Sequence, residues 1–279
     1  LITGSSGFLG NNLFAYFKQK KCTVYGFDLI AGKDLLNDRD LVTALKRVDY
    51  VCHLAAVGDV YLAAEDPKLA ATIGVGGTAN LVKVASKLGN IKKIVYASTW
   101  EVYGPPQYQP LDENHPCNPD HPYSISKYGG ELMLKSKLNN VPWVILRLGS
   151  AYGPYMRKNA VIPLFINQAK SDKKISLAGD GLQTRQFTFS DDIARAFELS
   201  IKSSVKNEVF NIVSEETQTI KSIAEMVNKK IPIEIQYGPK RKGDVPSALV
   251  SAKKAQRMLS WKAKVKFEDG FRKLFKSLS

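Results

Sequence analysis

The sequence has few of the residues that build disulfide frameworks, metal sites or membrane spans. It contains three cysteines and three histidines in 279 residues, with no CxxC pair and no Cys/His cluster. We therefore expect no disulfide framework and no metal site, and a reducing compartment such as the cytoplasm. No apolar run approaches the roughly 18 residues that a membrane-spanning helix needs, so no membrane association is expected.

Acidic residues are also scarce relative to basic ones. The 40 Lys and Arg outnumber the 26 Asp and Glu, which gives a net charge of +14 at pH 7. The excess is concentrated in residues 238–279, where twelve Lys and Arg face three Asp and Glu. Such a segment can bind phosphorylated molecules, nucleic acid or an anionic membrane surface, or can simply be a solvated surface. Nucleic acid is not an expected partner, because no basic run is interleaved with aromatic residues.

The first half of the chain alternates short apolar segments with helical patterns. It begins at Leu1, inside an apolar strand pattern, so we expect the true N-terminus to precede this residue. The predicted strands are residues 1–3, 23–27, 50–54, 93–97 and 143–148. The predicted helices are residues 11–20, 38–46, 75–88 and 123–138. Repeated strand–helix units predict an α/β fold with a Rossmann-type doubly wound parallel sheet, buried on both faces.

The pattern changes after Gly153 and Pro154, where the elements become shorter. The predicted helices there are residues 160–168, 191–201, 220–228 and 267–275. The predicted strands are residues 175–177, 209–213 and 233–237. We assign residues 1–153 with about 184–213 to the Rossmann domain, and about 154–183 with 214–279 to a smaller C-terminal α/β lobe.

A glycine-rich turn opens the chain in the segment "LITGSSGFLGNN". Gly4, Gly7 and Gly10 follow a strand and begin a helix, where a tight turn and free N–H groups suit a pyrophosphate. The spacing GxxGxxG fits the usual dinucleotide pattern only loosely. Asp28 ends the second predicted strand, where a carboxylate binds a ribose 2′-OH and repels a 2′-phosphate, so NAD is favoured over NADP. Lys33 could weaken that preference, and Asp28 could instead cap a turn.

Tyr123 and Lys127 lie four residues apart in "PYSISK", at the start of a predicted helix. Residues at this spacing share one helix face. An ammonium near a phenol lowers the phenol pKa from about 10, which suits a general acid or base. Taken alone, such a pair is common on helix surfaces.

Polar residues end the fourth predicted strand in "ASTWEVYG". Ser98, Thr99 and Glu101 lie where the carboxyl ends of parallel strands form the ligand crevice of an α/β sheet. The alternative for Thr99 is a turn-capping hydroxyl. Trp100 could pack internally or form a wall of the pocket.

In this order, these motifs resemble the extended short-chain dehydrogenase/reductase family, the NAD-dependent sugar-nucleotide epimerases and dehydratases of the UDP-glucose 4-epimerase type. The resembling segments are "TGSSGFLG", "HLAA", "YASTWEVYG", "PYSISKYGGE", "LRLGSAYGP", "RQFTFSDD" and "KRKGDVP". The resemblance implies that the first domain binds NAD and that the smaller lobe binds a nucleotide sugar.

The resemblance also implies roles for the catalytic residues. Tyr123 would take the proton of the sugar C4 hydroxyl, Thr99 would hold the reacting oxygen, and Lys127 would bind the nicotinamide ribose. Oxidation would give a 4-keto sugar, and return of the hydride to its other face would complete a 4-epimerisation. The implied enzyme is an isomerase, a sugar-nucleotide 4-epimerase acting on a UDP-hexose.

Further contacts follow from the resemblance. The implied cofactor contacts, besides Tyr123 and Lys127, are Gly4, Ser6, Gly7, Phe8, Leu9, Gly10, Asp28, Asp34, Leu35, Leu54, Ala55 and Ala56. The implied substrate contacts are Ser98, Glu101, Ser150, Arg185, Arg241 and Asp244. Two of these, Arg185 and Arg241, would hold the nucleotide diphosphate, for which a planar guanidinium is well suited.

Some features leave the activity and assembly open. Gly74 and Ser150 stand where the family often has Asn, which puts the identity of the sugar in doubt. Trp100 replaces an acid usual in 4,6-dehydratases, whereas Glu101 is compatible with both an epimerase and a UDP-uronic acid decarboxylase. A non-catalytic NAD-binding or RNA-binding member is a further alternative, although such a protein would be expected to lose the Tyr/Lys pair. By resemblance we expect a homodimer that packs through the helices predicted at 75–88 and 123–138.

Overall fold

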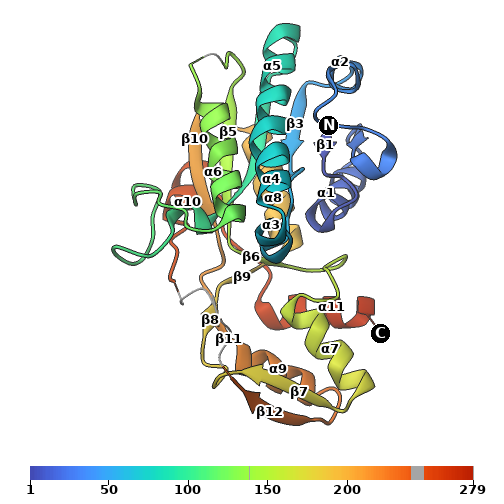
Figure 1. Ribbon diagram of the computed structural model, residues 1–279, viewed down its shortest axis with the longest axis vertical. Helices are drawn as coiled ribbons and strands as arrows, with labels where there is room; N and C mark the ends of the chain where they lie inside the picture. The colour runs from blue at the N-terminus through green and yellow to red at the C-terminus, as the bar shows by residue number, and fades with distance from the viewer. Residues whose placement is uncertain (138, 240–247, 279) are drawn as a thin grey trace.

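A computed structural model describes residues 1–137, 139–239 and 248–278. Figure 1 shows a larger lobe, in which helices cover both faces of a sheet, stacked on a smaller lobe of short strands and helices. The N-terminus lies in the larger lobe, and the C-terminus lies at the end of α11 (Phe267–Leu278) in the smaller one. No helix within the described ranges is long and apolar enough to cross a membrane.

The larger lobe contains a six-stranded sheet in the order β10-β5-β4-β3-β1-β2, with every pairing parallel. The strands are β1 (Ile2–Thr3), β2 (Gly26–Phe27), β3 (Tyr50–His53), β4 (Lys93–Thr99), β5 (Trp143–Leu148) and β10 (Glu208–Ile212). The predicted doubly wound parallel sheet is confirmed, although β2 begins three residues later than predicted. Because the strand order reverses between β1 and β3, a ligand crevice is expected at their carboxyl ends.

Helices cover both faces of this sheet. One face packs against α1 (Phe8–Gln19), α8 (Ser190–Lys202) and α10 (Lys253–Leu259), and the other against α2 (Asp38–Leu45), α5 (Thr78–Leu88) and α6 (Pro122–Lys135). Along β4, Val95 and Ala97 join the first core, whereas Ile94 and Tyr96 join the second. Burial on both faces is the reason that this strand is apolar at successive positions.

The sequence analysis did not predict three short elements between β3 and α5. These are α3 (Val60–Glu65), α4 (Pro67–Ala71) and the π-helical turn η2 (Thr72–Gly77). The first two are too short to show a helical repeat, and each is capped by an aspartate. Within η2, a Cβ on Gly74 would lie 2.9 Å from the Ser126 Cβ on α6. Glycine at this position therefore permits close packing of η2 on α6.

In the described part of the chain, the smaller lobe has three two-stranded sheets and three helices around an aromatic core. Its strand pairs are β6 (Ser150–Tyr152) with β9 (Phe187–Phe189), β7 (Lys174–Ala178) with β12 (Glu234–Gly238), and β8 (Thr184–Arg185) with β11 (Gln218–Thr219). Its helices are α7 (Val161–Ser171), α9 (Ile220–Asn228) and α11. Rings of Tyr152, Phe187, Phe189 and Phe267 contact one another in its core.

The two lobes share elements and contacts. β8 and β9 pair in the smaller lobe, although the sequence analysis assigned residues from about 184 to the Rossmann domain, and the chain enters the larger core only with α8 and β10. It enters the larger core again with α10 and Trp261, which the sequence analysis placed in the smaller lobe. The buried Trp261 Nε1 donates to the Asp192 carbonyl at 2.8 Å. Asn12 on α1 donates to the Pro154 carbonyl at 2.8 Å and accepts from Ser190 on α8 at 2.9 Å. These contacts fix the smaller lobe beside the carboxyl ends of the strands.

Candidate active site

A cavity of about 670 Å³ lies at the carboxyl ends of β1, β3, β4 and β5, and segments far apart in the sequence meet along it. The predicted site residues that line it are Gly4, Ser6, Gly7, Phe8, Leu9, Gly10, Asp28, Leu54, Ala55, Ala56, Ser98, Thr99, Glu101, Tyr123, Lys127 and Ser150. The cofactor and substrate contacts implied by resemblance are therefore mostly placed around one space.

The glycine-rich turn between β1 and α1 forms one end of this cavity. Gly4 has a positive φ of 68°, and a Cβ there would lie 2.8 Å from the Ala55 nitrogen. A Cβ on Gly10 would lie 2.0 Å from the Gly4 carbonyl oxygen. Within the described chain, Gly7 gives α1 no side-chain cap, so the N–H groups of its first turn face the cavity end. The backbone and helix dipole here fit a pyrophosphate group.

Asp28 lines the same end of the cavity and also caps a turn. Its carboxylate accepts from the Ser6 N–H at 2.9 Å and from the Ile30 N–H at 3.0 Å, at the start of η1 (Leu29–Ala31). The capping role kept open by the sequence is therefore present, and the carboxylate still borders the cavity.

Two predicted cofactor contacts do not line the cavity, and two predicted substrate contacts cannot be placed. Asp34 and Leu35 are not among the described residues that line the cavity. Leu35 is buried in the core against η2, and Asp34 accepts from the Leu36 N–H at 2.9 Å. Arg241 and Asp244 lie outside the described residues.

Arg185 lines a small adjoining pocket rather than the main cavity. This pocket shares Trp100, Gly149 and Ser150 with the main cavity. Trp100 is buried in a cluster that contains Tyr103, so the two roles considered for it, packing and forming a pocket wall, both occur.

Thr99, Tyr123 and Lys127 form part of the wall of this cavity. Thr99 ends β4, and its hydroxyl accepts from the Glu101 N–H at 3.3 Å, capping η3 (Trp100–Tyr103). Thr99 also lies close enough to the Tyr123 phenol to lower its pKa. Tyr123 and Lys127 are one turn apart on α6 and both face the cavity. This arrangement places a hydroxyl, a phenol and an amine beside one ligand space.

The protonation of this wall differs from the expectation of an acidic phenol. Burial raises the pKa of Tyr123 above its usual value, the Glu101 carboxylate raises it further, and the nearby Thr99 side chain acts to lower it. Burial lowers the pKa of Lys127 to about 7, against the opposing effect of Glu131. The reason is desolvation, which disfavours the charged form of both groups.

Glu101 lies close to this wall. Burial raises the pKa of Glu101 to about 7, Arg185 acts to lower it, and Asp120 acts to raise it. The carboxyl group is therefore poised to gain or lose a proton near neutral pH.

Ser98 contacts a buried ion pair behind the cavity. Its hydroxyl donates to Glu131 Oε1 at 2.6 Å, and Arg147 donates to the two carboxylate oxygens at 3.0 and 2.8 Å. Glu131 and Arg147 are both buried, and sequence reasoning gave neither a role although both lie in the resembling segments.

Sequence reasoning also missed Asp59 and Arg157, which line the cavity and form an ion pair across it. Asp59 accepts from the Tyr61 N–H at 2.8 Å at the start of α3. Arg157 follows β6 and acts to lower the pKa of Tyr123. A lone Asp and a lone Arg in distant loops form no sequence pattern, so only the tertiary structure reveals this pair.

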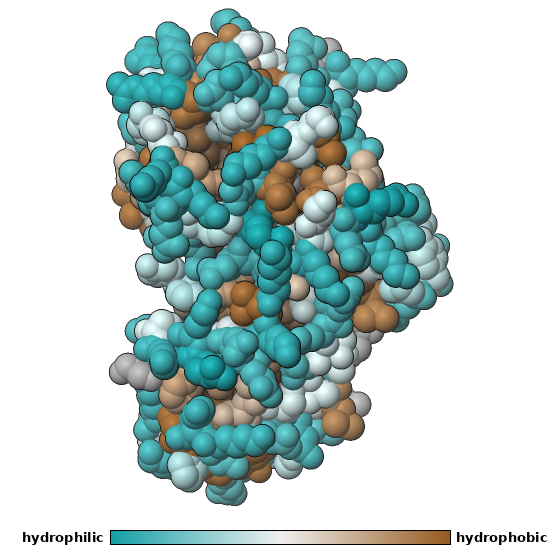
Figure 2. Space-filling view, turned by 180° about the vertical axis from the view of Figure 1, so that it is seen from behind, coloured by the Kyte–Doolittle hydropathy of each residue, from teal (hydrophilic) through white to brown (hydrophobic). Residues whose placement is uncertain are grey.

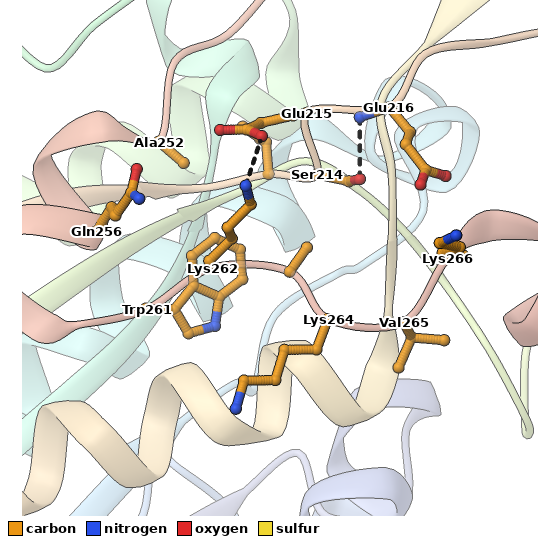
Figure 3. A pocket seen from close by; sticks show the side chains of 12 residues that line it. Ser214, Glu215, Glu216, Ala252, Gln256, Trp261, Lys262, Lys264, Val265 and Lys266 are labelled. Atoms are coloured by element: carbon orange, nitrogen blue, oxygen red, sulfur yellow. Dashed lines mark hydrogen bonds and ion pairs between the residues drawn. The ribbon is translucent and has the colours of Figure 1, made fainter.

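A second cavity, of about 260 Å³, lies between the segments 213–216 and 261–266. Figure 3 shows Lys262 reaching toward Glu215, with which it forms an ion pair at 3.1 Å, and Trp261 beneath them. None of the predicted site residues is among the described residues that line it. The larger cavity is therefore the candidate active site.

Comparison with known proteins agrees with this geometry. The model of the NAD dependent epimerase/dehydratase family matches residues 1–213. A UDP-glucose 4-epimerase of Mycolicibacterium smegmatis is 28% identical over 98% of this chain and 96% of its own. The structure of a UDP-N-acetylglucosamine 4-epimerase from Methanobrevibacter ruminantium, in complex with UDP-N-acetylmuramic acid, has a TM-score of 0.91 at 28% identity and covers 99% of this chain and 96% of its own.

The Thermus thermophilus UDP-glucose 4-epimerase in complex with NAD has a TM-score of 0.88 at 26% identity, over 99% of this chain and 97% of its own. The family match begins at the glycine-rich turn and extends through Thr99, Tyr123 and Lys127. The chain therefore belongs to the NAD-dependent epimerase/dehydratase family of enzymes.

Proposed function

We propose that the chain is a sugar-nucleotide 4-epimerase that acts on a UDP-hexose. The observation that carries this proposal is that the Thr99 hydroxyl, the Tyr123 phenol and Lys127 lie on one wall of the cavity, the last two one turn apart on α6. A C4 hydroxyl held between the two oxygens would lie within reach of a proton acceptor.

In this reaction each residue of the cavity wall has a separate role. Thr99 orients the C4 hydroxyl, Tyr123 takes its proton and later returns it, and Lys127 binds the nicotinamide ribose. When bound, NAD supplies the hydride acceptor and a positive charge, which favours ionisation of the phenol. Arg185, in the adjoining pocket, is placed to bind the nucleotide diphosphate. The 4-keto sugar formed in this way turns over before it is reduced at its other face.

The names of the relatives support an epimerase, since the protein from M. smegmatis and the two solved structures are all described as 4-epimerases. The competing activity is decarboxylation of a UDP-uronic acid. Glu101 favours neither activity over the other, because its carboxyl group lies near the reacting wall in both cases.

The test is incubation of the purified enzyme with UDP-glucose, UDP-N-acetylglucosamine and UDP-glucuronate. We expect the C4 epimer of at least one of them, identified by proton NMR of the sugar. Release of CO₂ from UDP-glucuronate would establish the decarboxylase instead. Absence of conversion of any nucleotide sugar would contradict the proposal.

We also propose that the enzyme is a homodimer. Figure 1 shows α4, α5 and α6 side by side on one face of the larger lobe. This face exposes Leu69 on α4 (47%) with Ile125 (51%) and Leu132 (46%) on α6. Figure 2 shows that polar side chains cover most of the opposite face and that hydrophobic residues there form only small patches. A second copy would bury the apolar helix face, and sedimentation equilibrium should give twice the chain mass.

A cytoplasmic location is a further proposal. Cys22, Cys52 and Cys117 are all free thiols, as expected in a reducing compartment. Fractionation of the source cells, with detection of the chain by antibody, tests this location.

A further inference from the structure

Lys127 stands over the face of an aromatic ring. Its Nζ lies 4.4 Å from the ring centroid of Tyr96, which is fully buried on β4 beneath α6. The lysine is only 3% exposed, and among the described residues it forms no ion pair. The charged form of a buried amine is costly unless something nearby stabilises it. The Tyr96 ring is placed to stabilise this ammonium.

We propose that Tyr96 is a positioning residue for Lys127, and that its ring face rather than its hydroxyl holds the ammonium at the reacting wall. An ammonium over a ring face is attracted by the negative potential of the π-system, most strongly where water is excluded. This inference rests on the catalytic role proposed above for Lys127. It adds a residue that does not line the cavity and that touches neither cofactor nor substrate.

The structure holds the Tyr96 ring rigidly. Its hydroxyl donates to the Lys127 carbonyl at 3.3 Å. Glycine at position 130 makes room for that hydroxyl, since a Cβ there would lie 2.4 Å from the Tyr96 oxygen. Behind Tyr96, the His53 ring lies 5.3 Å away and is fixed by hydrogen bonds to Thr3 and Thr78 at 2.7 and 3.0 Å.

The groups that face Lys127 come from three elements. On α6 these are Glu131, which acts to raise the pKa of Lys127, and Tyr123, which is one turn away and lines the same cavity. On β4, Tyr96 remains neutral because burial raises its pKa well above the usual value. On β3, burial and then the Lys127 charge lower the pKa of His53 to about 3, so this ring is also neutral.

The Glu131 carboxylate already accepts hydrogen bonds from Arg147 and Ser98. The aromatic face is therefore a separate contribution to keeping Lys127 charged. Removal of the ring should lower the lysine pKa, whereas removal of the hydroxyl alone should not.

The test compares Tyr96→Phe with Tyr96→Met in the full chain without cofactor, with lysines labelled at ¹³Cε and titrated by NMR. Surface lysines titrate near about 10.4, and Lys127 should titrate near neutrality, with its signal assigned by its loss in Lys127→Met. We expect Tyr96→Phe to leave this pKa within about 0.3 units, and Tyr96→Met to lower it by about 0.5 to 1.5 units. An unchanged pKa in Tyr96→Met, or an equal shift in both variants, would overturn the inference.

Tyr152→Met is the matched control, because it makes the same substitution at another fully buried tyrosine, in the smaller lobe. It should lower the melting temperature without moving the Lys127 titration.

In the NAD-loaded enzyme, the alkaline limb of the kcat/KM profile should move to lower pH in Tyr96→Met by the same amount as the lysine pKa. If Lys127→Met retains full turnover, the proposed function fails. If Lys127→Met is inactive but the alkaline limb of the pH profile stays in place in Tyr96→Met, the proposed function stands and only the positioning role of Tyr96 fails.

Discussion

Tyr123 lies beside Thr99 and Glu101 in the cavity wall, and desolvation there, taken without cofactor, keeps its phenol protonated. Its chemistry therefore depends on charges that arrive with the ligand as well as on Lys127. The low local dielectric that raises its pKa also strengthens the electrostatic effect of any nearby positive charge on the phenol.

Replacement of Tyr123 by Phe is expected to lower kcat by about 10²- to 10⁴-fold, because it removes the group that transfers the C4 proton. The aromatic ring remains, so the melting temperature and the NAD content should be close to those of the wild type. Steady-state turnover with the nucleotide sugar found in the incubation test measures kcat, and a thermal melt measures the melting temperature. A variant as active as the wild type would rule out the phenol as the proton acceptor.

Glu101 gives a prediction about pH and stability. Its pKa is raised to about 7 by burial, so between its unfolded pKa near about 4.3 and pH 7 the folded state binds more protons than the unfolded state. The free energy of unfolding should therefore fall as pH rises through this window. Relative to Glu101→Gln, the wild type should lose roughly 1 to 3 kcal/mol between pH 5 and pH 8. Urea unfolding of both proteins at the two pH values measures the difference, and parallel pH dependences would contradict it.

At the scale of elements, the contact between α6, η2 and β4 decides where α6 lies. Glycines on α6 and η2 bring these backbones close together. A Cβ on Gly130 would lie 2.4 Å from the Tyr96 hydroxyl and 2.9 Å from the Gly74 carbonyl oxygen. The helix that carries Tyr123 and Lys127 is therefore positioned by the absence of side chains behind it.

Gly130→Ala is expected to destabilise the protein by about 1 to 3 kcal/mol, because the added methyl overpacks this contact. Gly76→Ala, in η2, is the control: the nearest atom to a Cβ there is a Leu36 methyl carbon at 4.0 Å. It should be neutral or stabilising by up to about 1 kcal/mol, since alanine restricts the unfolded chain. Chemical denaturation gives the free energy of unfolding of both variants. Equal changes in this free energy would refute the close-packing explanation.

At the scale of the whole molecule, shared elements and contacts fix the two lobes to each other. Asn12 on α1 contacts both the start of the smaller lobe and α8, and Trp261 returns to the larger core after the smaller lobe is built. The substrate end of the cavity is therefore bordered by residues from both lobes, such as Glu101 and Arg157.

Leu132→Glu is expected to convert the proposed dimer to a monomer, because it places a charge at the centre of the exposed α6 face. The free energy of unfolding of the monomer should change little, since the side chain is 46% exposed. Leu182→Glu, at a 59% exposed leucine in the smaller lobe, should leave the dimer intact. Sedimentation velocity distinguishes the species, and a Leu132→Glu protein of dimer mass would exclude this interface.

Local features of the sequence were enough to locate much of the fold and of the candidate site. The alternation of strands and helices predicted the parallel sheet, because burial on both faces imposes apolar strands. The glycine-rich turn and the Tyr123/Lys127 pair were found because each depends on spacing within a few residues, and Asp28 was found because it ends a predicted strand. The short helices between β3 and α5 escaped prediction, since five or six residues show no period.

Only the tertiary structure decided which residues from distant segments contact one another. The Asp59–Arg157 ion pair, the Glu131–Arg147 pair behind Ser98, and the Tyr96 ring under Lys127 join residues with no local pattern. The protonation of Tyr123, Lys127 and Glu101 also belongs to this level, and it reversed the expectation of an acidic phenol. The physical reason is that spacing along the chain determines which groups share a face, whereas burial and the charges around them depend on every element that packs against that face.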